Sequence, residues 1–276
     1  MIVRIEDDLD LSKIADCGQC FRAKQFDDTW RFVTRDQAVY IKRASENEYE
    51  ARLCNFSENN ISEGELWENV WKPYFDLSRS YKDVRSLSKS DPFMAQAAEL
   101  GKGIRILKQD PFEMLLTFIV SQRKSIPAIK KSVEAMCKRF GRRVETDMEE
   151  FYLFPKASDI DTGEASELSE CSLGYRLDYI KSAVSMVASG ELDLGALEGL
   201  SDEALFEALK AVRGVGDKVS NCICLFAYGR TGRAPVDVWI KRMMDEHYNG
   251  ENPFLAYGDA AGIMQQYIFY FAQQTK

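Results

Sequence analysis

β-Branched and aromatic side chains concentrate in two short segments near the start of the chain, residues 29–34 and 38–42. The polar residues 35–37 between them indicate that the two segments form a hairpin. Residues 48–56 continue the pattern and predict a third strand. Apolar residues then recur with the period of a helix at residues 63–74 and 92–100, so this part of the chain predicts mixed α and β structure.

The pattern changes near residue 104, after which almost every apolar run has the period of a helix. Asp110 is followed by a proline and by an acid in the first turn, which are signals for the start of a helix. We expect Ser125 to cap the next helix and Gly141 to end it. Shorter helical patterns follow at residues 175–189 and 201–212.

These patterns together predict an α+β fold with two domains. Residues 1–104 are expected to form an N-terminal domain with an antiparallel sheet and helices. Residues 105–276 are expected to form a mostly α-helical domain.

The composition is typical of a soluble globular protein, with 45% hydrophobic and 29% charged residues in 276. The longest apolar stretch, residues 114–120, is too short to cross a bilayer, and the first residues lack the apolar core of an export signal. We expect a cytoplasmic monomer without a membrane partner. Seven cysteines in such a chain favour reduced thiols over a disulfide framework. They also favour free thiols over a zinc site built from the two close pairs, Cys17/Cys20 and Cys222/Cys224.

Charge and histidine content limit the possible chemistry. The net charge of −8 argues mildly against a nucleic-acid partner, but residues 121–143 hold eight cations against one acid. On charge alone this segment is typical of a solvated helix face. His247 is the only histidine, which excludes catalysis by groups of histidines. Reaction chemistry must therefore come from Lys, Asp, Glu, Cys or the backbone.

A short hairpin, Gly214-Val215-Gly216, separates two helical patterns and is followed by Lys218 in the first turn of the second helix. Glycines permit positive φ and let backbone N–H groups approach an anion, and a helix N-terminus adds unpaired donors. Together they predict a site for a phosphate group, recognised through its charge and not through a base sequence. Taken alone, such a turn is more often a simple helix end, and Lys218 more often a surface lysine.

Asp237 stands at the N-cap position of a further helix, in the segment Ala234-Pro235-Val236-Asp237. A capping carboxylate receives backbone N–H bonds, so it is ionised and held in place. Besides capping, such an anion can stabilise a positive charge that develops on a sugar.

The hairpin, its lysine and the Pro-Val-Asp helix start resemble the helix-hairpin-helix DNA glycosylases, and more closely the two-domain 8-oxoguanine DNA glycosylases in a bacterial-like variant. The resemblance covers nearly the whole chain. Further matches are Cys17-Gly18-Gln19-Cys20-Phe21-Arg22, Gln109-Asp110-Pro111-Phe112-Glu113, Leu173-Gly174-Tyr175-Arg176 and the segment from Gly216 to Cys224.

The resemblance implies a glycosylase and β-lyase of base excision repair, acting on double-stranded DNA that contains 8-oxoguanine, without a cofactor. It makes Lys218 the nucleophile that forms a Schiff base and Asp237 its electrostatic partner. For base recognition it implies the Gly18 carbonyl, Gln265 at the Watson–Crick edge, and Phe269 with Cys222 on the two faces of the base.

The resemblance also implies DNA contacts at Arg123, at Tyr175 and Arg176, which reach into the duplex, at Gly214, Val215 and Gly216, and at Trp239. Backbone carbonyls of Lys210, Val212 and Val215 match positions that can hold a cation beside a phosphate, but no metal is firmly indicated. Ala128 stands where eukaryotic members carry an arginine that contacts cytosine, which predicts a relaxed preference for the opposite base.

Two alternatives stay open at this point. The first is a glycosylase of the same superfamily for another damaged purine, although such relatives commonly lack the lysine. The second is a non-catalytic helix-hairpin-helix DNA-binding module, which would explain the hairpin but not Lys218 and Asp237.

Overall fold

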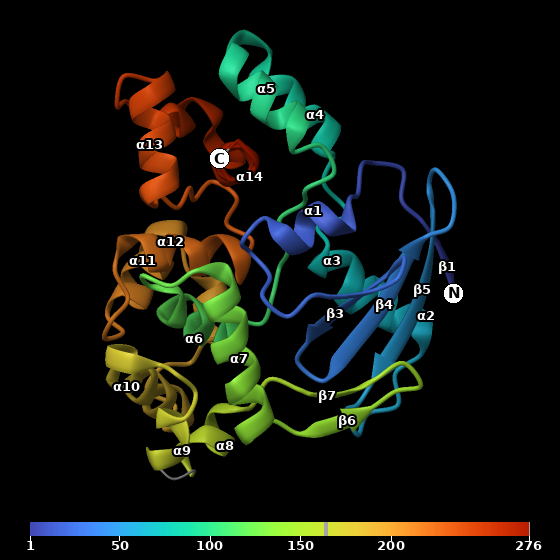
Figure 1. Cartoon of the computed structure of the whole chain (residues 1–276), viewed down its shortest axis with the longest axis vertical. Helices are drawn as coiled ribbons and strands as arrows, with labels where there is room; N and C mark the ends of the chain where they lie inside the picture. Colours follow the sequence, from blue (N-terminus) through green and yellow to red (C-terminus); the bar gives the residue numbers. More distant parts are fainter. Residues whose placement is uncertain (163–164, 276) are drawn as a thin grey trace.

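A computed structural model describes residues 1–162 and 165–275. The N-terminal part contains a five-stranded antiparallel sheet with the strand order β1-β5-β4-β3-β2 (Figure 1). The predicted hairpin is confirmed, because β3 pairs with β4 across the polar turn, and so is the third strand, β5. The strands are β1 (Ile2–Arg4), β2 (Lys24–Phe26), β3 (Thr29–Thr34), β4 (Gln37–Arg43) and β5 (Glu48–Asn55).

The predicted helix over residues 63–74 is present, but its central turn is wider. Ser62 forms a capping box with Glu65, and a π-helical turn, Trp67–Trp71, then carries two buried tryptophans toward the sheet. Phe32 from β3 packs edge-on against Phe75, with 5.1 Å between the ring centroids. The helices of the N-terminal part are α1 (Leu11–Asp16), α2 (Glu63–Leu66), α3 (Lys72–Tyr74), α4 (Tyr81–Ser86) and α5 (Pro92–Leu100).

The helical part follows the predicted starts and stops closely. The Asp110 side chain caps α6 by accepting from the N–H groups of Phe112 and Glu113, and Gly141 ends α7. Ser125 occupies the N-cap position of α7, but its side chain makes no capping hydrogen bond, so that expectation is only half met. The helices are α6 (Pro111–Ser121), α7 (Ile126–Phe140), α8 (Ala157–Asp161), α9 (Ala165–Ser169), α10 (Leu177–Ala188), α11 (Asp202–Lys210), α12 (Asp217–Phe226), α13 (Val238–His247) and α14 (Ala261–Gln274).

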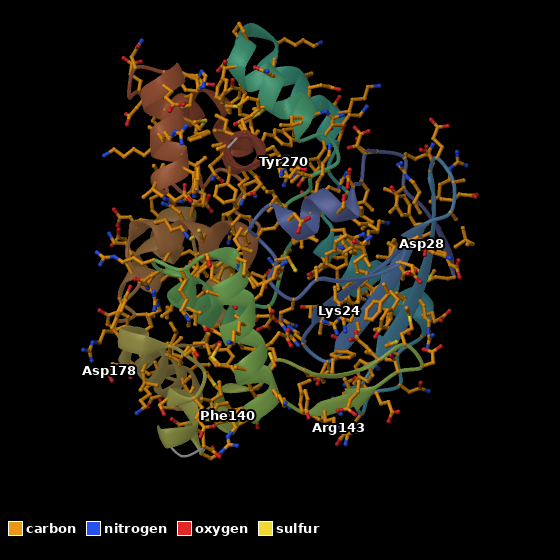
Figure 2. All side chains as sticks on the ribbon, in the orientation of Figure 1. Lys24, Asp28, Phe140, Arg143, Asp178 and Tyr270 are labelled. Carbon is orange, nitrogen blue, oxygen red and sulfur yellow. The ribbon has the colours of Figure 1, made fainter. Side chains whose placement is uncertain are left out.

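The second part is mostly α-helical, as predicted, and its described residues also contain a short β-hairpin that was not predicted. A β-hairpin of β6 (Arg143–Glu145) and β7 (Glu150–Tyr152) lies along the N-terminal sheet (Figure 1). Its apolar side chains form a small core with Val33, Ala38 and Tyr40 of the sheet. Glu149 forms a buried ion pair with Arg31 at 2.5 Å and pairs with Lys24 at 2.7 Å. Figure 2 labels Lys24 on the sheet and Arg143 at the start of the β6–β7 hairpin.

The two parts of the chain share their main core. The helix α5, which precedes the predicted boundary near residue 104, packs against α14 at the other end of the sequence. Its buried residues Met94 and Ala97 belong to the same hydrophobic cluster as α6, α12 and α14. The exact domain boundary stays a prediction. Among the described helices, none combines the length and hydrophobicity that a bilayer span requires.

Candidate active site

The hairpin between α11 and α12 has the predicted form, but its two glycines serve different purposes. Gly214 has a φ of +88°, and a Cβ there would lie 2.5 Å from the Tyr179 ring, so both conformation and space require glycine. Gly216 has an extended backbone with a φ of −99°, and an added Cβ would meet nothing within 4 Å. Of the two glycines, only Gly214 uses the positive φ that glycine permits. Val215 between them is buried.

Helix α12 begins at this hairpin without a side-chain cap, since Gly216 has no side chain to offer. The N–H groups of its first turn are therefore available to an anion outside the protein. The Asp217 carboxylate, which belongs to the same turn, pairs with Lys210 at 3.0 Å and so does not occupy these N–H groups. Within the hairpin, the Val212 carbonyl accepts a hydrogen bond from the Val215 N–H at 3.0 Å. Binding of a cation at the carbonyls of Lys210, Val212 and Val215 stays a prediction.

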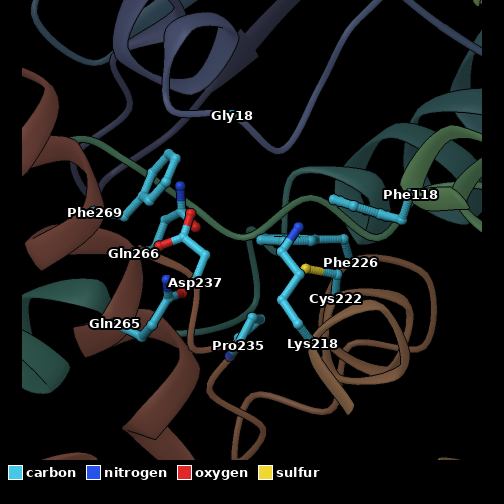
Figure 3. Close-up of a pocket in the computed structure, with 10 residues that line it drawn as sticks. All are labelled: Gly18, Phe118, Lys218, Cys222, Phe226, Pro235, Asp237, Gln265, Gln266 and Phe269. Atoms are coloured by element: carbon cyan, nitrogen blue, oxygen red, sulfur yellow. The ribbon is translucent and has the colours of Figure 1, made fainter. Parts of the chain in front are cut away.

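Lys218 projects from the first turn of α12 into a pocket (Figure 3). Its Nζ lies 5.3 Å from the centroid of the Phe118 ring and beside the thiol of Cys222, one turn further along the helix. Burial raises the pKa of the Cys222 thiol, and the neighbouring Lys218 cation opposes that rise. Cys222 is thus a neutral apolar wall next to the amine.

Asp237 caps α13 as predicted, and it also faces the pocket. Its Oδ1 accepts from the backbone N–H groups of Trp239 and Ile240 at 3.0 and 2.9 Å. No donor among the described residues bonds Oδ2. Figure 3 shows the carboxylate and the Lys218 amine on opposite sides of the pocket. The cap fixes the anion while leaving one oxygen for a substrate.

The far wall of the pocket comes from α14 and from the loop after α1. Gly18 has a φ of +75°, and an added Cβ would lie 2.7 Å from Cε1 of Phe269, so the ring can approach this backbone only because position 18 is glycine. Gln265 is 4% exposed, and its Oε1 is buried without a hydrogen-bond partner. A buried amide oxygen left unpaired costs about 1–3 kcal/mol, which a bound polar ligand would recover.

The structure thus brings together all six predicted catalytic and base-recognition residues, which come from four separate segments: Gly18, Lys218, Cys222, Asp237, Gln265 and Phe269. Four further lining residues were not predicted, namely Phe118, Phe226, Pro235 and Gln266. Phe118 and Phe226 stack with 5.5 Å between their ring centroids. In the sequence both belong to apolar helical runs, where nothing separates a pocket wall from core.

Comparison with known proteins agrees with this geometry. Residues 1–115 match the family model described as "8-oxoguanine DNA glycosylase, N-terminal domain". The structure of MBOgg1 in complex with a low-affinity DNA ligand is 34% identical, with a TM-score of 0.90, and the match covers 99% of this chain and 95% of that one. The chain belongs to the 8-oxoguanine DNA glycosylase family.

Two other relatives support the same assignment. The 8-oxoguanine glycosylase/lyase of Clostridium acetobutylicum, in complex with double-stranded DNA containing cytosine opposite 8-oxoguanine, is 32% identical with a TM-score of 0.87; the match covers 100% of this chain and 98% of that one. A probable N-glycosylase/DNA lyase of Methanothermobacter thermautotrophicus is 27% identical over 73% of each chain. The expected family is confirmed, and with it the expectation of a DNA glycosylase with lyase activity.

The glycosylase presents Tyr175 on its surface, and the predicted contact of this residue with the duplex stays a prediction. The side chain is 53% exposed, where an ordinary tyrosine after a glycine turn would be buried. It meets Tyr179 edge-on at 6.1 Å between ring centroids, and Tyr179 in turn packs on Gly214 of the hairpin. Arg123 is also exposed, in the turn between α6 and α7, with a φ of +52°.

Arg176 and Trp239 are placed differently from what a DNA contact would suggest. Arg176 is only 6% exposed, and its guanidinium donates to the backbone carbonyls of Gln122 and Leu173. In this structure it therefore ties two turns together and does not project from the surface. Trp239 is half-buried and packs against the helical core. DNA contacts by either residue stay predictions.

The cysteines and acids of the glycosylase form no metal centre in the described part of the chain, where no group of three or more histidine, cysteine, aspartate or glutamate side chains is placed to hold an ion. The seven cysteines are free thiols. Cys17 and Cys20, which have zinc-like spacing, are both buried, and burial raises the pKa of each thiol.

Proposed function

We propose that this glycosylase flips 8-oxoguanine out of duplex DNA and excises it through a Schiff base at Lys218. The observation that carries the proposal is the pocket itself. It places a lysine amine and a fixed carboxylate on opposite sides of one cavity, which an unbonded carbonyl and a buried amide oxygen without a partner also line. The solved relative with 8-oxoguanine in DNA supports the choice of lesion.

The Gly18 carbonyl supplies the discrimination between the lesion and guanine. Guanine N7 is a hydrogen-bond acceptor, whereas 8-oxoguanine carries N7–H, which is a donor. No donor among the described residues bonds the Gly18 oxygen. This oxygen accepts from the lesion and repels the lone pair of guanine. Gln265, which offers both a donor and an acceptor, then pairs with the Watson–Crick edge, and Phe269 and Cys222 contact the two faces of the base.

The chemistry uses the Lys218 amine and the Asp237 carboxylate, which face the pocket from its two sides. After Lys218 loses a proton, its amine attacks the sugar C1′, the bond from C1′ to the base breaks, and its electron pair leaves with the base. Asp237 stabilises the positive charge that develops on the sugar. The nitrogen of the adduct then gives up a proton and the bond from C1′ to the ring oxygen O4′ breaks, so the sugar ring opens to the Schiff base and O4′ becomes a hydroxyl group. Removal of a proton from C2′ then expels the 3′ phosphate and nicks the strand.

The direct test is incubation with duplexes that carry a single 8-oxoguanine or a guanine at the same position. We expect release of 8-oxoguanine and strand cleavage at that position without added base, and no cleavage of the guanine duplex. Equal cleavage of both duplexes, or of neither, would contradict the proposed substrate. A duplex with an alkylated purine separates this proposal from a glycosylase for another damaged base.

We expect excision opposite cytosine to be only modestly faster than excision opposite thymine, guanine or adenine. Ala128 offers no donor to an estranged cytosine, and Arg176 is already bonded to two carbonyls. Each good base-edge pair contributes about 1–3 kcal/mol of discrimination, so its absence relaxes the preference. The measurement is the single-turnover excision rate opposite each base.

The matched variant Ala128→Arg restores a donor at this position and should increase the preference for cytosine. A wild-type preference for cytosine over adenine on the order of several hundredfold would show that another residue reads the opposite base.

A further inference from the structure

The loop that carries Gly18 has no regular secondary structure, so neither a helix nor a strand fixes the direction of its peptide units. The Gly18 residue itself, with a φ of +75° and no side chain, is conformationally free compared with its neighbours. A carbonyl that must distinguish a donor from a lone pair has to be held in direction as well as in place. The loop therefore needs an external support.

Two buried glutamines supply hydrogen bonds on either side of the Gly18 carbonyl. Gln266 of α14 donates its amide to the carbonyl of Cys17, the residue before Gly18. Gln109, just before α6, donates to the carbonyl of Gln19, the residue after it, at 2.8 Å. The two side chains are 2% and 5% exposed. The carbonyls of the residues before and after Gly18 are thus held by hydrogen bonds, whereas the Gly18 carbonyl between them has no hydrogen-bond donor among the described residues.

The Gln19 side chain completes the support from inside the loop. It is fully buried, accepts from the Leu107 N–H at 2.8 Å and donates to the Arg105 carbonyl at 2.8 Å. These bonds fasten the loop to the extended segment before α6. A hydrogen bond in such a dry environment is directional and hard to replace, because water cannot reach the groups it would leave unpaired.

We propose that Gln266 and Gln109 are positioning residues for lesion recognition: they orient the Gly18 peptide so that its carbonyl points at N7 of the extruded base. Gln266 stands in the pocket wall, but its amide is used by the Cys17 carbonyl and not offered to the base. Gln265, its neighbour in sequence, keeps an unpaired amide oxygen. The two adjacent glutamines therefore have different roles: Gln266 holds the peptide next to the Gly18 carbonyl, and Gln265 contacts the base.

This inference rests on the proposed function, and the test compares two substrates. Removal of 8-oxoguanine requires recognition of the base, whereas cleavage of a preformed abasic site requires only the lysine and the sugar. Gln266→Met and Gln109→Met keep the side-chain length and remove the donor. We expect each to slow single-turnover excision of 8-oxoguanine by about tenfold to a hundredfold. Cleavage of the abasic duplex should change by less than about twofold.

Gln273→Met is the matched control, since Gln273 lies two turns further along α14 and makes no hydrogen bond to the Gly18 loop. It should leave the ratio of the two rates unchanged. Abasic-site cleavage also reports whether each variant folds. A parallel loss of both activities in Gln266→Met and Gln109→Met, or no loss of either, would overturn the inference. A wild-type protein that cleaves abasic DNA but spares 8-oxoguanine would instead overturn the proposed function, and the inference with it.

Discussion

Replacement of Lys218 by glutamine should lower 8-oxoguanine excision by at least about a thousandfold and abolish the covalent complex that borohydride traps. Glutamine keeps much of the side-chain volume next to Phe118 and Cys222 but has no nucleophilic amine. Binding of lesion DNA should stay close to that of the wild type, because the hairpin and the base pocket are intact. Single-turnover rates, gel-resolved adducts and a binding isotherm measure the three effects.

Lys82→Gln on α4 provides the matched control, since it removes an exposed lysine of the N-terminal part. It should trap and excise like the wild type. Full-yield trapping by Lys218→Gln would show that another amine forms the Schiff base.

Asp237→Asn should keep the fold but lose about a hundredfold to a thousandfold in excision rate. Asparagine is as good an N-cap as aspartate, so the bonds to the Trp239 and Ile240 N–H groups can be retained. What disappears is the negative charge that faces the developing sugar cation. A role in capping alone would predict at most about 2 kcal/mol of lost stability and no comparable kinetic defect. Melting curves beside single-turnover rates distinguish the two roles.

Asp110→Asn is a close control, because Asp110 caps α6 through the same pair of backbone contacts but does not line the pocket. It should alter stability as much as Asp237→Asn does while leaving the excision rate near that of the wild type. A folded Asp237→Asn protein that excises 8-oxoguanine at the wild-type rate would rule out the electrostatic role.

Features that depend on neighbours in sequence could be predicted from the sequence. The capping aspartates 110 and 237, the strand hairpin around residues 35–37 and the turn at Gly214 each follow from local backbone preferences, and the structure confirms them. Short motifs also predicted that Gly18, Lys218 and Gln265 lie in one site, because members of a family share a three-dimensional structure in which the matching positions lie together.

Features that depend on packing between distant segments could not be predicted in this way. The strands β6 and β7 are short and rich in charged residues. Their apolar side chains pack against a sheet that lies more than a hundred residues earlier in the chain. The burial of Arg176 depends on two carbonyls, one of them in the α6–α7 turn. The hydrogen bond from Gln266 to Cys17 spans 249 residues. None of these contacts produces a periodic pattern of apolar residues from which it could be predicted.

The central claim is that Lys218 becomes covalently joined to the damaged sugar. It is tested most directly by reducing the reaction on 8-oxoguanine DNA with borohydride, digesting the adduct and locating the sugar remnant by mass spectrometry. We expect the remnant on the peptide that contains Lys218, in the first turn of α12. A remnant on another lysine or on the N-terminal amine, or excision of 8-oxoguanine without any trapped adduct, would contradict it.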